Sequence, residues 1–238
     1  MRKLPLLVVF ALALALGVAG IAQAVNSKQN MTVKLAKNKA GTPTKPADVG
    51  KLTVDLSIAV DSTDTPFATS NVVLFFDKNL VFNNAKFKTC TQAQVRARAA
   101  ACKAAKVGGG VAQGQALGQT EDLKVDAYNG PKSNLLLHVT KVSGPLDIDE
   151  VIVGKLAKAS GAYGKKLVVT IPPNLQQPIA GVYATLTKFL TTVGGTQKKV
   201  PYIALKGCPK NKKLKIHGDF KFTDGSTQKI DKTVACKK

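Results

Sequence analysis

Alternation of apolar and polar residues recurs along the chain and indicates β-strands. It is clearest over residues 51–60, where Leu, Val, Leu, Ile and Val stand at every second position. This period of two predicts a strand with one buried face. Residues 71–76 are apolar at both parities, which predicts a strand in the middle of a sandwich. Shorter runs predict further strands at 31–35, 123–128, 135–139, 151–156, 166–171, 182–190 and 202–205.

The last two predicted strands can be placed in register. Their apolar residues all stand at even positions: Leu214, Ile216, Phe220, Phe222, Ile230 and Val234. Facing residues of an antiparallel pair sum to a constant, so both sets share a face only if the loop has an odd number of residues. This excludes a two-residue turn at Asp224-Gly225. Cys208 and Cys236 are even as well, so the hairpin can bring both to its inner face.

One segment favours a helix. A capping box at Thr91–Gln94 precedes an alanine-rich run. A continuous helix would hold Cys90 and Cys102 about 18 Å apart, whereas a disulfide needs Cα atoms within about 7 Å. If these cysteines are paired, the helix is confined to about residues 91–99 and the chain breaks near residues 98–101.

The remaining punctuation is typical of loops and turns. Glycines at 108–110 open a stretch to residue 119 that predicts a flexible connection, and it lacks the patterns of phosphate-binding loops. Asn129-Gly130-Pro131 predicts a turn between two strands. Many short strands with one short helix predict an all-β fold, an immunoglobulin-like β-sandwich of roughly 8–11 strands.

The N-terminus predicts export. Met1-Arg2-Lys3 precedes an apolar run that ends at Ala22-Gln23-Ala24, which is the order of a signal peptide with cleavage after residue 24. A retained anchor is the alternative, because the run approaches the length that spans a bilayer. We expect a polar tail and edge strand at 25–50 and a single domain at 51–238, with a division near 144–147 left open. The protein would be secreted, extracellular or in the cell envelope, with no membrane span after cleavage.

The four cysteines fit that location. An even number in an exported chain indicates two disulfides, with three possible connectivities. We expect nearest neighbours to pair, Cys90 with Cys102 and Cys208 with Cys236. A zinc site is disfavoured because the chain has no C-x-x-C pair and only two histidines.

The charge is strongly positive, with a formal net value of +21. Lysine dominates, and beyond residue 24 the only arginines are Arg96 and Arg98. Because lysine is a hydrated point charge, this composition favours a solvated surface over dedicated anion recognition. The candidate anion-binding residues lie near the C-terminal end: Lys206, Lys210, Lys212, Lys213 and Lys215. With no tryptophan and little arginine, nucleic acid is disfavoured as a partner. An anionic cell-envelope or extracellular polymer fits better.

No catalytic, cofactor or metal signature is present. His138 and His217 have no sequence neighbour that would make either a general base. The acidic residues do not match a calcium loop; they are Asp147, Asp149 and Glu150, with Asp61 and Asp64 as a sparser pair. We therefore expect a non-enzymatic structural or binding domain. The alternative is an extracellular hydrolase whose site is built from distant carboxylates, and a concave pocket with close carboxylates would favour it.

Several landmarks resemble those of secreted β-sandwich proteins without assigned function that occur as paralogues in actinobacteria. They are NKAGTPTKPADVGKLTV from residue 38, FFDKNLVFNNAKFKTC ending at Cys90, VGGGVAQGQ from 107, AYNGP at 127–131, and GCPK with FKFTDGST towards the C-terminus. The resemblance implies a sandwich with two local disulfides and no functional residues. The chain departs from it at Lys103, where proline would follow the cysteine.

Overall fold

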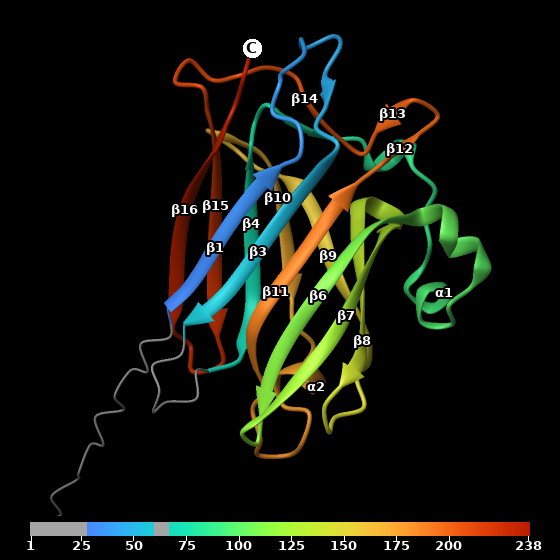
Figure 1. Cartoon of the computed structure of the whole chain (residues 1–238), viewed down its shortest axis with the longest axis vertical. Coiled ribbons are helices and arrows are strands. Elements are labelled where there is room, and N and C mark those ends of the chain that lie inside the picture. Colours follow the sequence, from blue (N-terminus) through green and yellow to red (C-terminus); the bar gives the residue numbers. More distant parts are fainter. Residues whose placement is uncertain (1–27, 60–66) are drawn as a thin grey trace, which may run out of the picture.

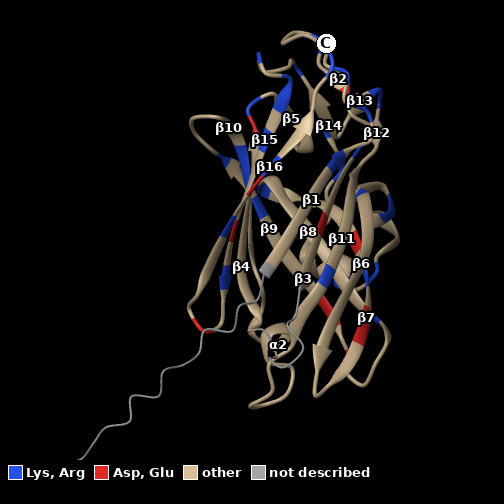
Figure 2. Ribbon diagram, turned by 60° about the vertical axis from the view of Figure 1, so that its left-hand side comes forward, with Lys and Arg blue, Asp and Glu red and all other residues tan. Residues whose placement is uncertain are grey.

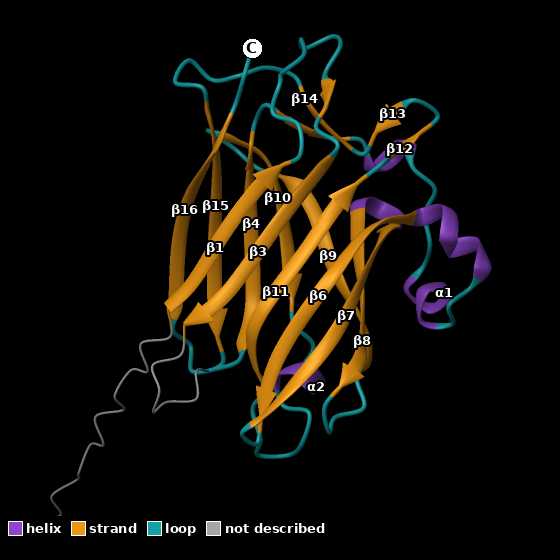
Figure 3. Ribbon diagram, in the orientation of Figure 1, coloured by secondary structure: helices purple, strands orange, loops and turns teal. Residues whose placement is uncertain are grey.

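The structure, a computed structural model, describes residues 28–59 and 67–238. The predicted signal peptide and the pair Asp61 and Asp64 lie outside these ranges. The all-β prediction is confirmed (Figure 3). Eleven strands form one antiparallel sheet. In sheet order they are β1 (Lys28–Leu35), β3 (Lys51–Ala59), β11 (Thr185–Gly194), β6 (Lys106–Ala116), β7 (Gln119–Gly130), β8 (Asn134–Ser143), β9 (Asp149–Lys158), β10 (Tyr163–Thr170), β4 (Thr69–Asp77), β15 (Lys213–Phe222) and β16 (Thr227–Ala235).

This sheet curls on itself until its two edge strands lie side by side, which gives a nearly closed barrel (Figure 1). Strands β1, β3, β11, β6 and β7 form the front wall, and β8, β9, β10, β4, β15 and β16 form the rear wall. The walls are the two layers of a sandwich, but one continuous sheet supplies both. Alternate residues of every strand therefore face a common interior.

Side-chain hydrogen bonds close the seam between β1 and β16. The Gln29 backbone N–H donates to Gln228 Oε1 at 2.8 Å, and Gln228 Nε2 donates to the Gln29 carbonyl at 3.0 Å. The side-chain amide of Gln228 thus makes the two hydrogen bonds that a neighbouring strand would otherwise make with the backbone of Gln29. Next to the seam, large inward side chains fill the interior, among them Met31, Leu214, Ile216 and Phe220.

Short elements cover both ends of the barrel. At the upper end of Figure 1, β2 (Ala47–Asp48), β14 (Ile203–Leu205) and β5 (Leu80–Phe82) form a small sheet, beside the pair β12 (Thr196–Gln197) and β13 (Val200–Pro201). At the lower end, α2 (Pro173–Gln176) lies between the walls. The turns η1 (Asn84–Lys86) and η3 (Pro131–Ser133) complete the described elements, apart from the segment that carries the first disulfide.

The predicted register of the last hairpin is confirmed. Lys213 faces Ala235 and Lys221 faces Thr227, so facing residues have an even sum. Phe222 N–H donates to the Ser226 carbonyl, which leaves a three-residue loop. The even-numbered apolar residues face the core, and the lysine-bearing face points outward.

The predicted break between the first two cysteines is also confirmed. Helix α1 (Gln92–Arg96) begins at a capping box, and Arg98 then takes a φ of +50°, before the turn η2 (Ala100–Ala105). The Cα atoms of Cys90 and Cys102 are 5.4 Å apart in the resulting disulfide. A second disulfide joins Cys208 and Cys236, so both expected pairs form. Two disulfides indicate a non-reducing compartment.

The prediction of a flexible connection at residues 108–119 is wrong, because most of this stretch belongs to β6. The glycines allow an unusually close approach to β11. A Cβ atom on Gly108 would lie 2.0 Å from the Thr192 carbonyl oxygen, and one on Gly110 would lie 1.8 Å from the Leu190 carbonyl oxygen. Here glycine signals backbone proximity within a sheet rather than a loop.

We predict that Gly110→Ala destabilises the protein by at least about 2 kcal/mol, because β6 and β11 must separate to admit the methyl group. The matched control is Gly114→Ala on the same strand, whose Cβ would meet nothing nearer than 3.5 Å. Its effect should stay within about 1 kcal/mol. Urea unfolding followed by circular dichroism measures both, and equal effects would contradict the close-approach explanation.

Candidate ligand chamber inside the barrel

The barrel interior contains an apolar cavity of about 140 Å³ towards its lower end. Both walls contribute to it, and its lining is almost entirely aliphatic or aromatic. The side chains that define it include Leu56, Val72, Ala112, Leu123, Val139, Ile152, Val169 and Leu186. A cavity of about this size with apolar walls is large enough to hold a benzene-sized molecule.

A second cavity of about 60 Å³ adjoins it towards the upper end. Four side chains line both spaces: Leu74, Leu137, Leu167 and Phe189. We call the two cavities together the chamber. These four side chains lie between the two cavities, so the cavities follow one another inside the barrel.

Strand number and small side chains together explain why the chamber is open. About eight strands enclose an interior that side chains just fill, and larger barrels leave space. This sheet has eleven strands. The inward positions Ala112 and Gly114 on β6, with Ala184 before β11, leave that space unfilled where they line the larger cavity.

One buried carboxylate stands in this apolar lining. Glu121 lies on the inward parity of β7 with Leu123 and Val125, and it is only 2% exposed. Its Oε1 accepts a hydrogen bond from the Leu146 N–H at 3.1 Å, while Oε2 is buried and has no partner among the described residues. Leaving such a hydrogen bond unmade costs about 1–3 kcal/mol. The unpaired oxygen of Glu121 therefore lowers the stability of the folded state.

Buried threonine hydroxyls repeat this pattern. Thr69 is among the residues that line the larger cavity and Thr191 among those that line the smaller one, and the buried hydroxyl of neither has a hydrogen-bond partner within the described ranges. Buried polar atoms in native proteins are nearly always paired. Of the four unpaired buried side-chain atoms in the described residues, three belong to residues that line the chamber, and the fourth is Thr223 Oγ1.

The lower end of the chamber is closed by loops rather than by strands. The connection from β10 to β11 supplies Ile171, Leu175 of α2 and Ala184. The loop between β8 and β9 supplies Leu146 and Ile148. Because loops open at a lower free-energy cost than hydrogen-bonded strands, a ligand would enter most easily at this end.

The sequence contains a pattern that indicates the burial of Glu121, although the predicted strand began too late to include this residue. The strand was predicted to start at residue 123, whereas β7 begins at Gln119. Extending the alternation of Leu123, Val125 and Ala127 by one period places Glu121 on the buried face. A carboxylate at an apolar-parity position is the recognisable mark.

His138 lies outside the chamber. It sits on the outward parity of β8 with Leu136, buried under the disulfide-bonded segment from Cys90 to Ala105. Its Nε2 donates to Asp149 Oδ1 at 2.6 Å. That hydrogen bond, together with the neighbouring Arg98, holds the pKa of Asp149 below its ordinary value. Because Asp149 also bonds Arg98, it attaches the segment from Cys90 to Ala105 to the barrel wall.

The two arginines take part in the same attachment. Arg96 pairs with Glu150 and Arg98 with Asp149, each at 2.7 Å. Gln92 Nε2 also donates to the Val151 carbonyl. Two of the three residues in the dense acidic cluster are thereby used as anchors for the segment.

His217 lies on the exposed face of the last hairpin between two carboxylates. Its Nδ1 donates to Asp231 at 2.8 Å and its Nε2 to Asp219 at 2.9 Å. Burial alone would lower the pKa of His217, but the hydrogen bonds and charges of Asp231 and Asp219 raise it above its ordinary value. Within residues 28–59 and 67–238, no hydroxyl or thiol hydrogen-bonds to either histidine ring.

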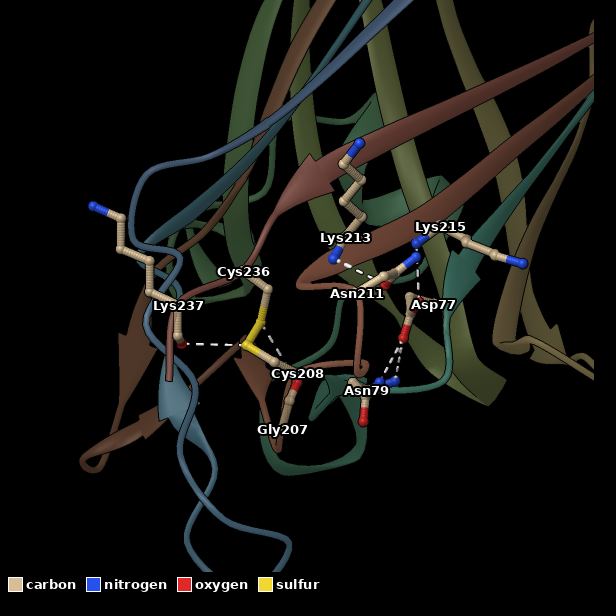
Figure 4. The surroundings of a disulfide bond; sticks show 9 residues. All are labelled: Asp77, Asn79, Gly207, Cys208, Asn211, Lys213, Lys215, Cys236 and Lys237. Carbon is tan, nitrogen blue, oxygen red and sulfur yellow. Dashed lines mark hydrogen bonds between the residues drawn. A yellow bond between two sulfur atoms is a disulfide. The ribbon is translucent and has the colours of Figure 1, made fainter.

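The candidate anion-binding lysines stay at the surface. Lys210, Lys212, Lys213 and Lys215 are exposed and Lys206 is half-buried. In the described part of the chain, none of the five forms an ion pair with an acidic residue. In Figure 4 the side chains of Lys213, Lys215 and Lys237 extend away from one another around the second disulfide. Basic residues are also spread over the walls (Figure 2). The structure thus offers a diffuse positive surface rather than a converging anion site.

The described residues contain no group of three or more histidine, cysteine or acidic side chains placed to hold a metal ion. None of the helices within these residues has the length and apolar character needed to cross a bilayer.

Comparison of the chain with protein-family models, curated proteins and solved structures finds no match. The resemblance to secreted actinobacterial proteins therefore stays a prediction.

We predict that the NMR titration of His217 has its midpoint above 6.5, and that Asp231→Asn lowers it. The stability that the protonated ring contributes is complete below the unfolded-state pKa of about 6.5 and is lost as the pH rises through the folded-state pKa. Relative to His217→Gln, the wild type should therefore lose stability in urea unfolding between pH 6 and pH 9. A midpoint at or below 6.5 would refute the doubly paired ring.

Proposed function

We propose that this chain is an exported, non-enzymatic binding protein that holds a small apolar molecule inside its barrel. The observation that carries the proposal is the chamber itself, an apolar space whose lining residues include three with a buried, unpaired polar atom. Ligand sites are typically concave and mostly apolar, with a few polar groups that orient the ligand. The predicted signal peptide and the two disulfides support a location outside the cytoplasm.

The hydrolase alternative has less support. Hydrolysis by paired carboxylates needs an acid and a base on opposite sides of the scissile bond. Glu121 is the one carboxylate among the described residues that line the chamber. Asp219 and Asp231 do converge, but they meet on His217 at the surface. Asp219 and Asp231, the carboxylates that come closest to forming an acid–base pair, therefore lie outside the chamber.

A second candidate function is contact with an anionic envelope or extracellular polymer through the lysine surface. The observation that favours it is the set of lysines near the second disulfide without acidic partners, which includes Lys212 and Lys213. Charges that are not neutralised within the fold remain available to a polyanion. The two functions are compatible, because the chamber lies inside the barrel and the lysines lie outside it.

For the chamber we predict that toluene binds the wild-type protein and that Ala112→Leu removes this binding. The larger side chain would occupy the cavity that Ala112 now lines. Isothermal titration calorimetry measures binding directly, and saturating toluene should raise the melting temperature of the wild type but not that of Ala112→Leu.

The control is Val111→Leu, which introduces the same residue on the exposed side of the same strand, where Val111 is 44% exposed. It should bind toluene like the wild type. Absence of toluene binding to the wild-type protein, or equal loss in both variants, would overturn the proposed function.

For the lysine surface we predict that binding to cell-wall fractions weakens as ionic strength rises, and that Lys212→Gln/Lys213→Gln weakens it further. The control double variant Lys51→Gln/Lys188→Gln removes the same charge from exposed positions on the front wall. A pull-down across a salt series compares the three proteins. Binding that ignores salt would rule out the charge-driven contact, and equal losses would assign it to net charge alone.

A further inference from the structure

The chamber has a polar end that specifies what its ligand carries. Glu121 lies close to the loops at the entrance, since the Leu146 N–H that it accepts from belongs to the loop between β8 and β9. Away from this end, the lining is formed by side chains such as Leu74, Leu137 and Phe189. A molecule in the chamber would meet a carboxyl group near one end and a mostly apolar lining elsewhere.

The free oxygen of Glu121 sets the chemistry at that end. Oε1 accepts from the Leu146 N–H, and Oε2 is buried against Gly144 without a partner among the described residues. A small turn of the side chain towards the chamber would let the carboxyl group accept a hydrogen bond from a ligand. A carboxyl oxygen forms its strongest hydrogen bonds with charged N–H donors. The carboxylate is also only 2% exposed, so water competes weakly for it.

The loop above Glu121 is shaped to bring the backbone close to this oxygen. Gly144 has a φ of +112°, and a Cβ atom there would lie 2.2 Å from Oε2. A side chain at this position would displace the carboxylate. The glycine therefore keeps Glu121 in place without supplying a hydrogen bond to Oε2.

We propose that the chamber binds a small amphipathic amine, whose ammonium group donates to Glu121 while its hydrocarbon part occupies the apolar interior. This inference rests on the proposed ligand chamber and adds the class of ligand.

The overall charge of the protein makes this preference unusually easy to test. A net charge of +21 favours anionic ligands over cationic ones at long range. Tighter binding of a cation therefore cannot come from the general field and must come from a local acceptor.

The test is calorimetry with three matched probes, hexylamine, 1-hexanol and hexanoate, at constant ionic strength and pH 7. We expect hexylamine to bind at least tenfold more tightly than hexanoate, with hexanol between them. Glu121→Gln, which keeps the shape of the side chain, should weaken hexylamine binding at least tenfold and leave toluene binding unchanged.

Toluene separates failure of this inference from failure of the chamber. If toluene binds but the three hexyl probes bind equally, or hexanoate binds best, the amine proposal is wrong and the chamber stands. If toluene does not bind either, the proposed function fails with it. Thermal unfolding of Glu121→Gln supplies a readout apart from binding: the variant should be at least as stable as the wild type, because the carboxylate lacks a partner for Oε2. A marked loss of stability would assign Glu121 a structural role and overturn the inference.

Discussion

The circumference of one nearly closed sheet determines how much space the molecule encloses, and the other features of the structure depend on it. Eleven strands that curl until their edges meet enclose more space than their inward side chains can fill. Close to the seam, Met31 and Phe220 are large enough to fill it. Opposite the seam, where β6 presents Ala112 and Gly114, the same wall spacing leaves a chamber. The candidate site is therefore a product of strand number combined with small residues on one strand.

The outer attachments follow from that closed shape. A barrel has no second layer to cover it, so each outward face is solvated or needs a local cover. The segment from Cys90 to Ala105 is such a cover, with its own small apolar cluster and the pairs of Arg96 and Arg98. It buries His138, which donates a hydrogen bond to Asp149. Two acidic residues that looked available in the sequence, Asp149 and Glu150, pair with these arginines, whereas Glu121, the carboxyl group of the candidate site, was not singled out from the sequence.

The sequence carried the local structure well, because strand parity, capping and loop closure are local properties. The even parity around Phe220 was enough to predict the three-residue loop of the last hairpin, and the distance between Cys90 and Cys102 was enough to predict the helix break. The glycines at 108–110 misled the prediction because their contacts are with β11, some eighty residues further along the chain. The closure of the sheet was equally out of reach, since it depends on β1 meeting β16 through Gln29 and Gln228. The chamber could not be predicted without that closure.

Both covalent cross-links are short-range. One closes a segment of twelve residues and the other ties together the two ends of a single hairpin region. Neither joins the front wall to the rear wall, and neither crosses the seam. The redox state of the surroundings thus acts on the outer segment and on the C-terminal loop. The width of the barrel is set by hydrogen bonds between strands and by core packing between the walls, and no sulfur–sulfur bond crosses it.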